Sequence, residues 1–100
     1  MHEDAVLAAV SGSGRQPVIL LDISRLGVCF TCPLQLASGT RHVLDFNLPG
    51  TGQLHETVVQ VVHSSPNGVP SGFRVGARFV HIRQETADSI VHFVSNSAPA

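Results

Sequence analysis

Apolar and polar positions alternate along much of the chain. In residues 41–48 (RHVLDFNL) the even-numbered side chains share one face of an extended strand and the odd-numbered ones share the other. Residues 73–82 (FRVGARFVHI) repeat this pattern, with Arg74, Gly76 and Arg78 on the outer face. A period of two is typical of half-buried β-strands, so both segments are predicted to be strands.

Four further apolar segments are bounded by turn-forming residues, which predicts that they are strands as well. They cover residues 6–10, 17–21, 27–32 and 54–63. The glycines of residues 11–16 (SGSGRQ) suit a hairpin turn. Proline, asparagine and glycine in residues 64–72 suit a loop.

The period changes near the end of the chain. Between residues 84 and 95, Ala87, Ile90, Val91 and Val94 recur at helical spacing, which predicts one amphipathic helix. Residues 96–100 (NSAPA) are expected to form a frayed tail.

Strands over about residues 5–82 followed by one helix predict a mainly β, or all-β, fold. A six-stranded antiparallel β-barrel with a C-terminal α-helix suits this order, because closure of a sheet removes its exposed edges. One hundred residues are enough for one domain, so residues 1–100 are expected to form a single domain.

The composition favours a packed core, with 43% hydrophobic and only 13% charged residues. The net charge is -1 and the chain has no lysine, so no general basic field would attract a nucleic acid polymer. No apolar run approaches the roughly 20 residues of a membrane span. The first ten residues also lack the shape of a signal peptide. A cytoplasmic protein without membrane insertion is expected.

The candidate chemical groups favour packing over catalysis. Cys29 and Cys32 fall on opposite sides of a predicted strand, too far apart for a disulfide. The histidines lack metal-ligand spacing and are expected at the surface or rim, with His55 and His63 at the same strand parity. No nucleophile–base pair or carboxylate pair is evident, so we expect a protein that is not an enzyme and holds no metal or cofactor.

Residues 20–30 (LLDISRLGVCF) contain the end of one apolar strand and the start of the next, and the sequence DISRLG connects them. Taken alone, Asp22 and Ser24 before Gly27 favour an ordinary side-chain-capped turn over a polar ligand-binding loop. The form D-x-S-x-x-G resembles the signature of the PilZ domain family, bacterial receptors of cyclic di-GMP. The resemblance extends through LDFNLPG, the valine-rich strand, RVGARFVHI and the segment ADSIVHFV.

The resemblance implies a six-stranded barrel with a terminal helix, in agreement with the periodicity. It also implies that Asp22 accepts hydrogen bonds from a guanine edge and that Ser24 donates to a base or a phosphate. Gly27 would permit a backbone turn that is closed to residues with a β-carbon.

The chain departs from the family at its start. The family's R-x-x-x-R arm precedes the first strand and wraps the dinucleotide, whereas this chain has His2, Glu3 and Asp4 there. Two explanations stay open: the domain lacks an arm by nature, or the start lies downstream of one. Arg25, Arg74 and Arg78 are possible donors, but their sequence spacing does not direct them at a ligand.

Two hypotheses follow. The first is a nucleotide-binding second-messenger receptor, which binds cyclic di-GMP through Asp22, Ser24 and Gly27 and relays it to a signalling or motility protein in motility or biofilm regulation. The second is an armless adaptor that binds such a protein without cyclic di-GMP.

Overall fold

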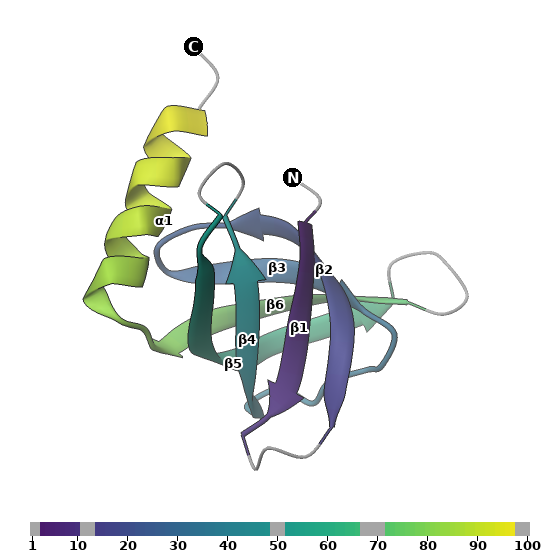
Figure 1. Ribbon diagram of the computed structural model, residues 1–100. Coiled ribbons are helices and arrows are strands. Elements are labelled where there is room, and N and C mark those ends of the chain that lie inside the picture. The colour runs from purple at the N-terminus through teal and green to yellow at the C-terminus, as the bar shows by residue number, and fades with distance from the viewer. Residues whose placement is uncertain (1–2, 11–13, 49–51, 67–71, 98–100) are drawn as a thin grey trace.

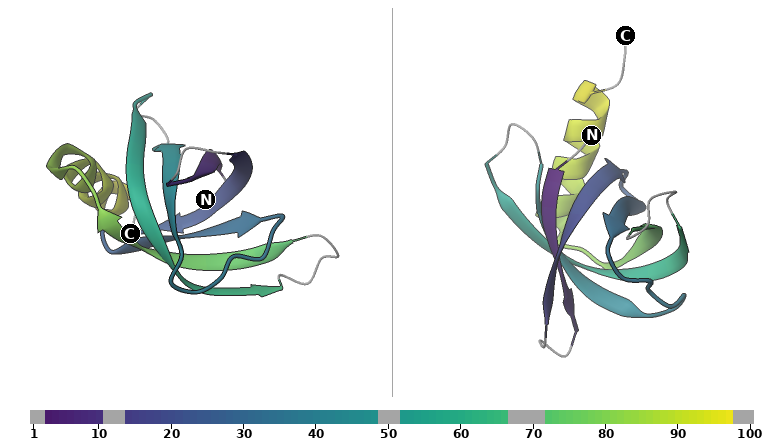
Figure 2. Two further views of the ribbon diagram at one scale, coloured as in Figure 1. Left: turned by 90° about the horizontal axis from the view of Figure 1, so that it is seen from below. Right: turned by 90° about the vertical axis from the view of Figure 1, so that its right-hand side faces the viewer.

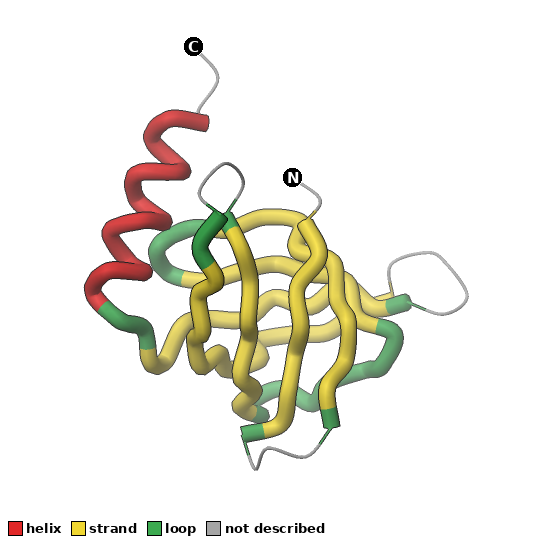
Figure 3. The backbone as a smooth tube through the Cα atoms, in the orientation of Figure 1, coloured by secondary structure: helices red, strands yellow, loops and turns green. Residues whose placement is uncertain are grey.

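The computed structural model describes residues 3–10, 14–48, 52–66 and 72–97. In that part of the chain, six strands precede one helix (Figure 1). The strands and helix are β1 (Glu3–Ala9), β2 (Arg15–Ile23), β3 (Gly27–Cys32), β4 (Arg41–Asn47), β5 (Leu54–Pro66), β6 (Phe73–His81) and α1 (Gln84–Ser97). The predicted succession of elements is therefore confirmed, and Figure 3 shows the helix after the last strand, near the C-terminal end.

The strands form a closed antiparallel barrel in the order β1-β2-β3-β6-β5-β4. Two pairings between strands that are distant in sequence, β1 with β4 and β3 with β6, complete the ring. In Figure 1, β1, β2 and β4 stand upright in front while β3 and β6 cross behind them. Because every strand is paired on both sides, the sheet exposes no long free edge. The predicted barrel with a C-terminal helix is confirmed.

The inward faces of the strands supply the core. Phe30 and Phe46 are fully buried, as are Leu20 and Leu44. Along β3 and β4, buried positions alternate with more exposed ones, as the period of two predicts. Cys32 lies in the core and Cys29 on the outer face, so the two free thiols point to opposite sides of β3.

Register shifts interrupt the β2–β3 pairing once and the β5–β6 pairing twice, and two of these three irregularities shape the outer face around the β2–β3 turn. In β2 the register shifts between Leu20 and Asp22, so that Leu20 and Ile23 are buried while Asp22 points outward. In β5 it shifts between Val61 and His63. A bulge inserts one unpaired residue and reverses the parity of the strand beyond it. These shifts cannot be predicted from the alternation of residue types.

The bulge in β5 corrects the expected placement of two histidines. His55, before the bulge, is buried, with 6% of its surface exposed. His63, after the bulge, lies on the outer face. Equal strand parity and a surface position for His55 were therefore both wrong. His55 occupies an inward position of β5, where its ring centroid is 5.6 Å from that of Phe46.

α1 packs beside the barrel (Figures 1 and 2). Ile90 is fully buried and Phe93 packs against the core cluster. Thr86 is buried as well, and its Oγ1 lies 3.0 Å from His55 Nδ1. The helical period is confirmed, but Val91 and Val94 are 45% and 39% exposed, so the buried face is rotated from the predicted one.

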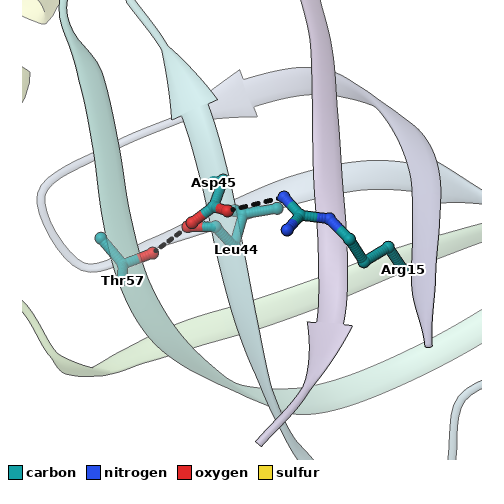
Figure 4. A network of polar contacts seen from close by, with 4 residues as sticks. All are labelled: Arg15, Leu44, Asp45 and Thr57. Atoms are coloured by element: carbon teal, nitrogen blue, oxygen red, sulfur yellow. Dashed lines mark hydrogen bonds and ion pairs between the residues drawn. The ribbon is translucent and has the colours of Figure 1, made fainter. Parts of the chain in front are cut away.

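Polar contacts connect β4 with its neighbour β5 and, across β1, with β2 (Figure 4). Arg15 Nη2 at the start of β2 lies 3.3 Å from Asp45 Oδ2. Thr57 Oγ1 of β5 donates to the Leu44 carbonyl over 3.2 Å. Arg15, which was predicted to lie within the first turn, therefore belongs to a strand.

Three predicted segments lie partly outside the described residues. They are the first turn at residues 11–13, the loop at residues 67–71 and the tail at residues 98–100.

No helix among the described residues has the length and apolar character needed to cross a bilayer.

Candidate functional site

The site begins at the turn between β2 and β3, which the Ser24 hydroxyl stabilises. The Ser24 backbone N–H donates to the Gly27 carbonyl over 2.9 Å. Ser24 Oγ accepts from the N–H groups of Leu26 and Gly27 at 3.3 and 3.4 Å. Its own proton has only a 3.5 Å contact with the Gly27 carbonyl, which is at the limit of a hydrogen bond. The hydroxyl therefore fixes the turn while its donor capacity is weakly used.

Asp22 stands at the last outward position of β2. Its Oδ1 accepts from the Ile23 N–H over 2.9 Å, which fixes the orientation of the carboxylate. Among the described residues, its second oxygen has no hydrogen-bond donor, and the side chain is exposed. One carboxylate oxygen is thus held and the other is available to a ligand.

Gly27 begins β3 and excludes a β-carbon through close packing. A β-carbon there would overlap the Ala77 carbonyl oxygen and lie 3.1 Å from the Arg78 Cα. The glycines with positive φ among the described residues are Gly14, Gly39 and Gly52, so Gly27 is not needed for a left-handed conformation. A β-carbon is excluded here, but the expected reason, a turn conformation open only to glycine, was wrong, because the cause is the approach of the β6 backbone.

Four outward positions on four strands form a row across the barrel. Asp22 lies opposite Cys29, Cys29 opposite Gly76, and Gly76 opposite His63. Gly76 leaves room for the imidazole, because a β-carbon on Gly76 would lie 2.5 Å from His63 Cε1 and 3.0 Å from Nδ1. The His63 ring therefore lies against the Gly76 backbone. The strand register thus places Asp22 and His63, which are 41 positions apart in the sequence, in the same row.

An open pocket of about 330 Å³ lies along this row, and we call it the turn pocket. Its lining comprises Asp22, Ile23, Ser24, Gly27, Val28, Cys29, Val62, His63, Gly76 and Ala77. A second depression of about 500 Å³, between residues 35–38 and 62–64, shares Val62 and His63 with it. All three motif residues thus contribute to one pocket that adjoins a second one.

Arginines stand on both sides of the turn pocket. Arg74 Nε donates to Cys29 Sγ over 3.2 Å. This hydrogen bond is the main reason why the pKa of Arg74 is raised above its ordinary value, and the charge of Asp22 adds to the effect. Arg78 lies opposite Gly27, and its Nη2 donates to Gln60 Oε1 over 3.3 Å. Arg25 is exposed on the turn itself.

The acidic residues at the start of the chain belong to β1. Glu3 lies opposite Leu20 and Asp4 opposite Ile19 in β2, and neither lines the turn pocket. His2 lies outside the described residues. The described part of the chain also contains no group of three histidine, cysteine or acidic side chains arranged to hold a metal ion.

The motif identified only part of this pocket from the sequence. His63 and Gly76 come from strands that are distant in sequence, and only the strand register brings them to Asp22. Gly76 could have been noticed from the sequence, because a glycine within a strand such as 73–82 often marks a place where another group approaches the backbone closely.

Residues 3–96 match the family profile described as "PilZ domain". No curated protein sequence matches the chain. The fold is similar to that of the inhibitor of motility MotI/DgrA from Bacillus subtilis, with a TM-score of 0.84 and 14% identity. That alignment covers 96% of this chain and 46% of the Bacillus protein, so this chain spans under half of its length.

The fold is also similar to that of the PilZ domain of YcgR from Escherichia coli, a structure that contains c-di-GMP. The TM-score is 0.74 and the identity 13%, over 94% of this chain and 80% of the other. At these identities the two likenesses establish the fold. Because the family profile spans nearly the whole chain and the barrel agrees with it, the chain belongs to the PilZ domain family, a family of cyclic di-GMP receptors.

Proposed function

We propose that this PilZ domain binds cyclic di-GMP in the turn pocket and relays the signal through contact with a signalling or motility protein, without catalysing a reaction. The observation that carries the proposal is that Asp22, Ser24 and Gly27 lie together on the lining of one open pocket. Membership of the PilZ family supports this class of ligand. The solved YcgR domain supports it, since that structure contains c-di-GMP.

Asp22 has the chemistry required for a guanine base. The Watson–Crick edge of guanine presents two adjacent N–H donors, and a carboxylate accepts from such a pair in a planar geometry. The bond from the Ile23 N–H restrains the carboxylate before the ligand arrives, which lowers the conformational entropy lost on binding.

Ser24 is suited to a phosphate oxygen or a base acceptor. Its proton makes only a 3.5 Å contact in the turn, so it can turn to a ligand while the hydroxyl oxygen still accepts from Leu26 and Gly27. Gly27 also lines the pocket, and its lack of a side chain lets the β6 backbone approach closely there.

The dimensions suit a ligand that extends beyond one pocket. A volume of 330 Å³ is at the low end for small-molecule sites. A dinucleotide can place one base in the turn pocket and continue over His63 and Val62 towards the adjoining depression. The ligand would then contact β2, β3, β5 and β6 together.

Calorimetric titration with cyclic di-GMP tests the proposal. Asp22→Asn keeps the oxygen that accepts from Ile23 but places an amide donor against the guanine donors, so we expect affinity to fall by at least about 10-fold. Asp88→Asn, the same change on the exposed face of α1, is the matched control. A folded wild-type sample that gives no heat at hundreds of micromolar ligand would refute the proposal.

A second candidate function is that of an adaptor without nucleotide. A pocket of about 220 Å³ with a largely apolar lining, including Leu7, Cys32 and Leu36, supports this alternative. Leu34 on its rim is 58% exposed. This alternative predicts that Asp22→Ala with Ser24→Ala leaves partner capture unchanged and that Leu34→Ser weakens it. The receptor hypothesis predicts loss of ligand-dependent capture for the first variant.

A further inference from the structure

β6 presents two arginines to the same outer face with Gly76 between them. Arg74, Gly76 and Arg78 lie opposite Thr31, Cys29 and Gly27 of β3, all on the outward side. Each arginine is two residues, or roughly 7 Å along the strand, from Gly76. The two cations therefore flank the glycine at the centre of the cross-strand row, one at each side of the turn pocket.

The side chain of Arg74 extends towards the cross-strand row that contains Asp22, Cys29, Gly76 and His63. Its Nε reaches Cys29 Sγ at 3.2 Å, although Cys29 lies opposite Gly76 in the register. Asp22, which lies opposite Cys29, acts electrostatically on the same guanidinium. The side chain is thus directed at the row that contains Asp22, while its Nη atoms remain available.

Arg78 occupies the other side, next to the β2–β3 turn. It lies opposite Gly27, whose carbonyl accepts from the Ser24 N–H. Gln60 Oε1 accepts from Arg78 at 3.3 Å and from Arg41 at 3.4 Å. An amide oxygen orients these guanidinium groups without neutralising them.

The charges of Arg74 and Arg78 remain uncompensated by direct ion pairs. Within the described residues, the ion pair is that of Arg15 with Asp45, on another part of the barrel. Arg74 and Arg78 contact a thiol and an amide instead. Guanidinium groups bind phosphate oxygens in a bidentate manner and remain charged at any physiological pH. This arrangement is suited to two anionic groups of one ligand.

We propose that Arg74 and Arg78 are phosphate-binding residues, which hold the two phosphates of cyclic di-GMP on either side of Gly76 while the His63 ring supports the ligand between them. This inference rests on the proposed function. It assigns cationic contacts to β6 of the barrel, whereas Glu3 and Asp4 of β1 carry negative charge and would repel a phosphate.

Calorimetric titration of the full chain with cyclic di-GMP tests this assignment. Arg74→Ala and Arg78→Ala are each expected to weaken binding about 10- to 100-fold, the range that corresponds to one charge-assisted hydrogen bond. Arg83→Ala, an equal change of charge at an exposed position between β6 and α1, is expected to leave affinity within about 3-fold. Arg74→Lys and Arg78→Lys should fall between, because they keep the charge and lose the bidentate geometry.

The outcomes separate the two proposals. If wild type binds, Asp22→Asn weakens binding, and the Arg74 and Arg78 variants match Arg83→Ala, the β6 assignment is overturned and the receptor function stands. If folded wild type gives no heat, both are overturned. Equal melting temperatures of the arginine variants and wild type establish that lost affinity reflects lost contacts, since exposed substitutions rarely alter folding.

Discussion

Gly76 of β6 lies opposite His63 of β5, and the imidazole ring fills the space that a β-carbon on Gly76 would need. Gly27 is also closely covered, but there the covering atom is the backbone carbonyl oxygen of Ala77. A side-chain ring on an exposed residue can rotate away, whereas a carbonyl inside a closed barrel cannot move alone. The two glycines should therefore respond differently to the same substitution.

Gly27→Ala is expected to destabilise the protein by about 2–4 kcal/mol, because the methyl group must displace the β6 backbone or break its pairing with β3. Gly76→Ala is expected to cost less than about 1 kcal/mol, because the displaced His63 ring can turn into solvent and alanine suits a strand better than glycine. Urea unfolding of the two variants measures the difference. Equal losses of stability would show that the two close approaches are energetically alike.

The buried face of α1 can be tested with two neighbouring residues. Ile90 is fully buried and Val91 is 45% exposed, although both are apolar. Ile90→Ala is expected to cost about 2–4 kcal/mol through lost burial and the cavity left behind, and Val91→Ala less than about 0.5 kcal/mol. Thermal unfolding provides the comparison. A larger effect at Val91 would place the helix face where the sequence pattern alone suggested.

These contrasts show how far local pattern predicts this fold. Residues 41–48 alternate without interruption, and β4 follows with Leu44 and Phe46 in the core. Residues 17–21 are apolar throughout, so nothing in them reveals that the register shifts between Leu20 and Asp22. A bulge depends on how neighbouring strands fit together, which residue type alone does not specify. The bulge between Val61 and His63 could not be predicted for the same reason, so His63 was wrongly expected on the same face as His55.

The candidate site was predictable only where it is local. Asp22, Ser24 and Gly27 lie within six consecutive residues, and a side-chain-capped turn was expected there from residue type. His63 and Gly76 reach the pocket through the β5–β6 and β3–β6 pairings. The outward direction of Arg74 and Arg78 was predicted, but their position at the two sides of the pocket required the register with Gly27 and Cys29.

His42 gives the stability a pH dependence of predictable sign. Burial lowers its pKa below the ordinary value of 6.5. Its Nε2 lies 3.0 Å from Thr40 Oγ1, which in turn lies 2.7 Å from the Ala37 carbonyl oxygen. Below about pH 6.5 the unfolded chain takes up a proton at His42 more readily than the folded one.

The contribution of neutral His42 is therefore complete above pH 6.5 and is lost as the pH falls through the lowered pKa of the folded state. His42→Gln retains a polar group that can hydrogen-bond to Thr40, and it does not titrate. Thermal unfolding between pH 8 and pH 5 should show a steeper loss of stability for wild type than for His42→Gln. Parallel pH profiles would contradict the assignment.

The contact between His55 and Thr86 links α1 to the barrel. His55 Nε2 is buried without a hydrogen-bond partner in the described structure, so Thr86 Oγ1 at 3.0 Å from Nδ1 is the polar contact that compensates the burial of this ring. Thr86→Val keeps the shape of the side chain and removes that contact. We expect it to cost about 1–3 kcal/mol, the range for a buried polar group left unpaired. Thr31→Val, the same change on the outer face of β3, should cost less than about 0.5 kcal/mol.

The loss should also be local to the helix, because the unpaired imidazole favours states in which α1 has moved away and water reaches Nδ1. Amide hydrogen exchange measures this directly: exchange in α1 should accelerate in Thr86→Val more than exchange in β3 or β4. Uniform acceleration over the barrel and helix would indicate that Thr86 stabilises the whole fold without selectively holding α1. Unchanged exchange and stability would mean that packing through Ile90 and Phe93 is sufficient to dock the helix.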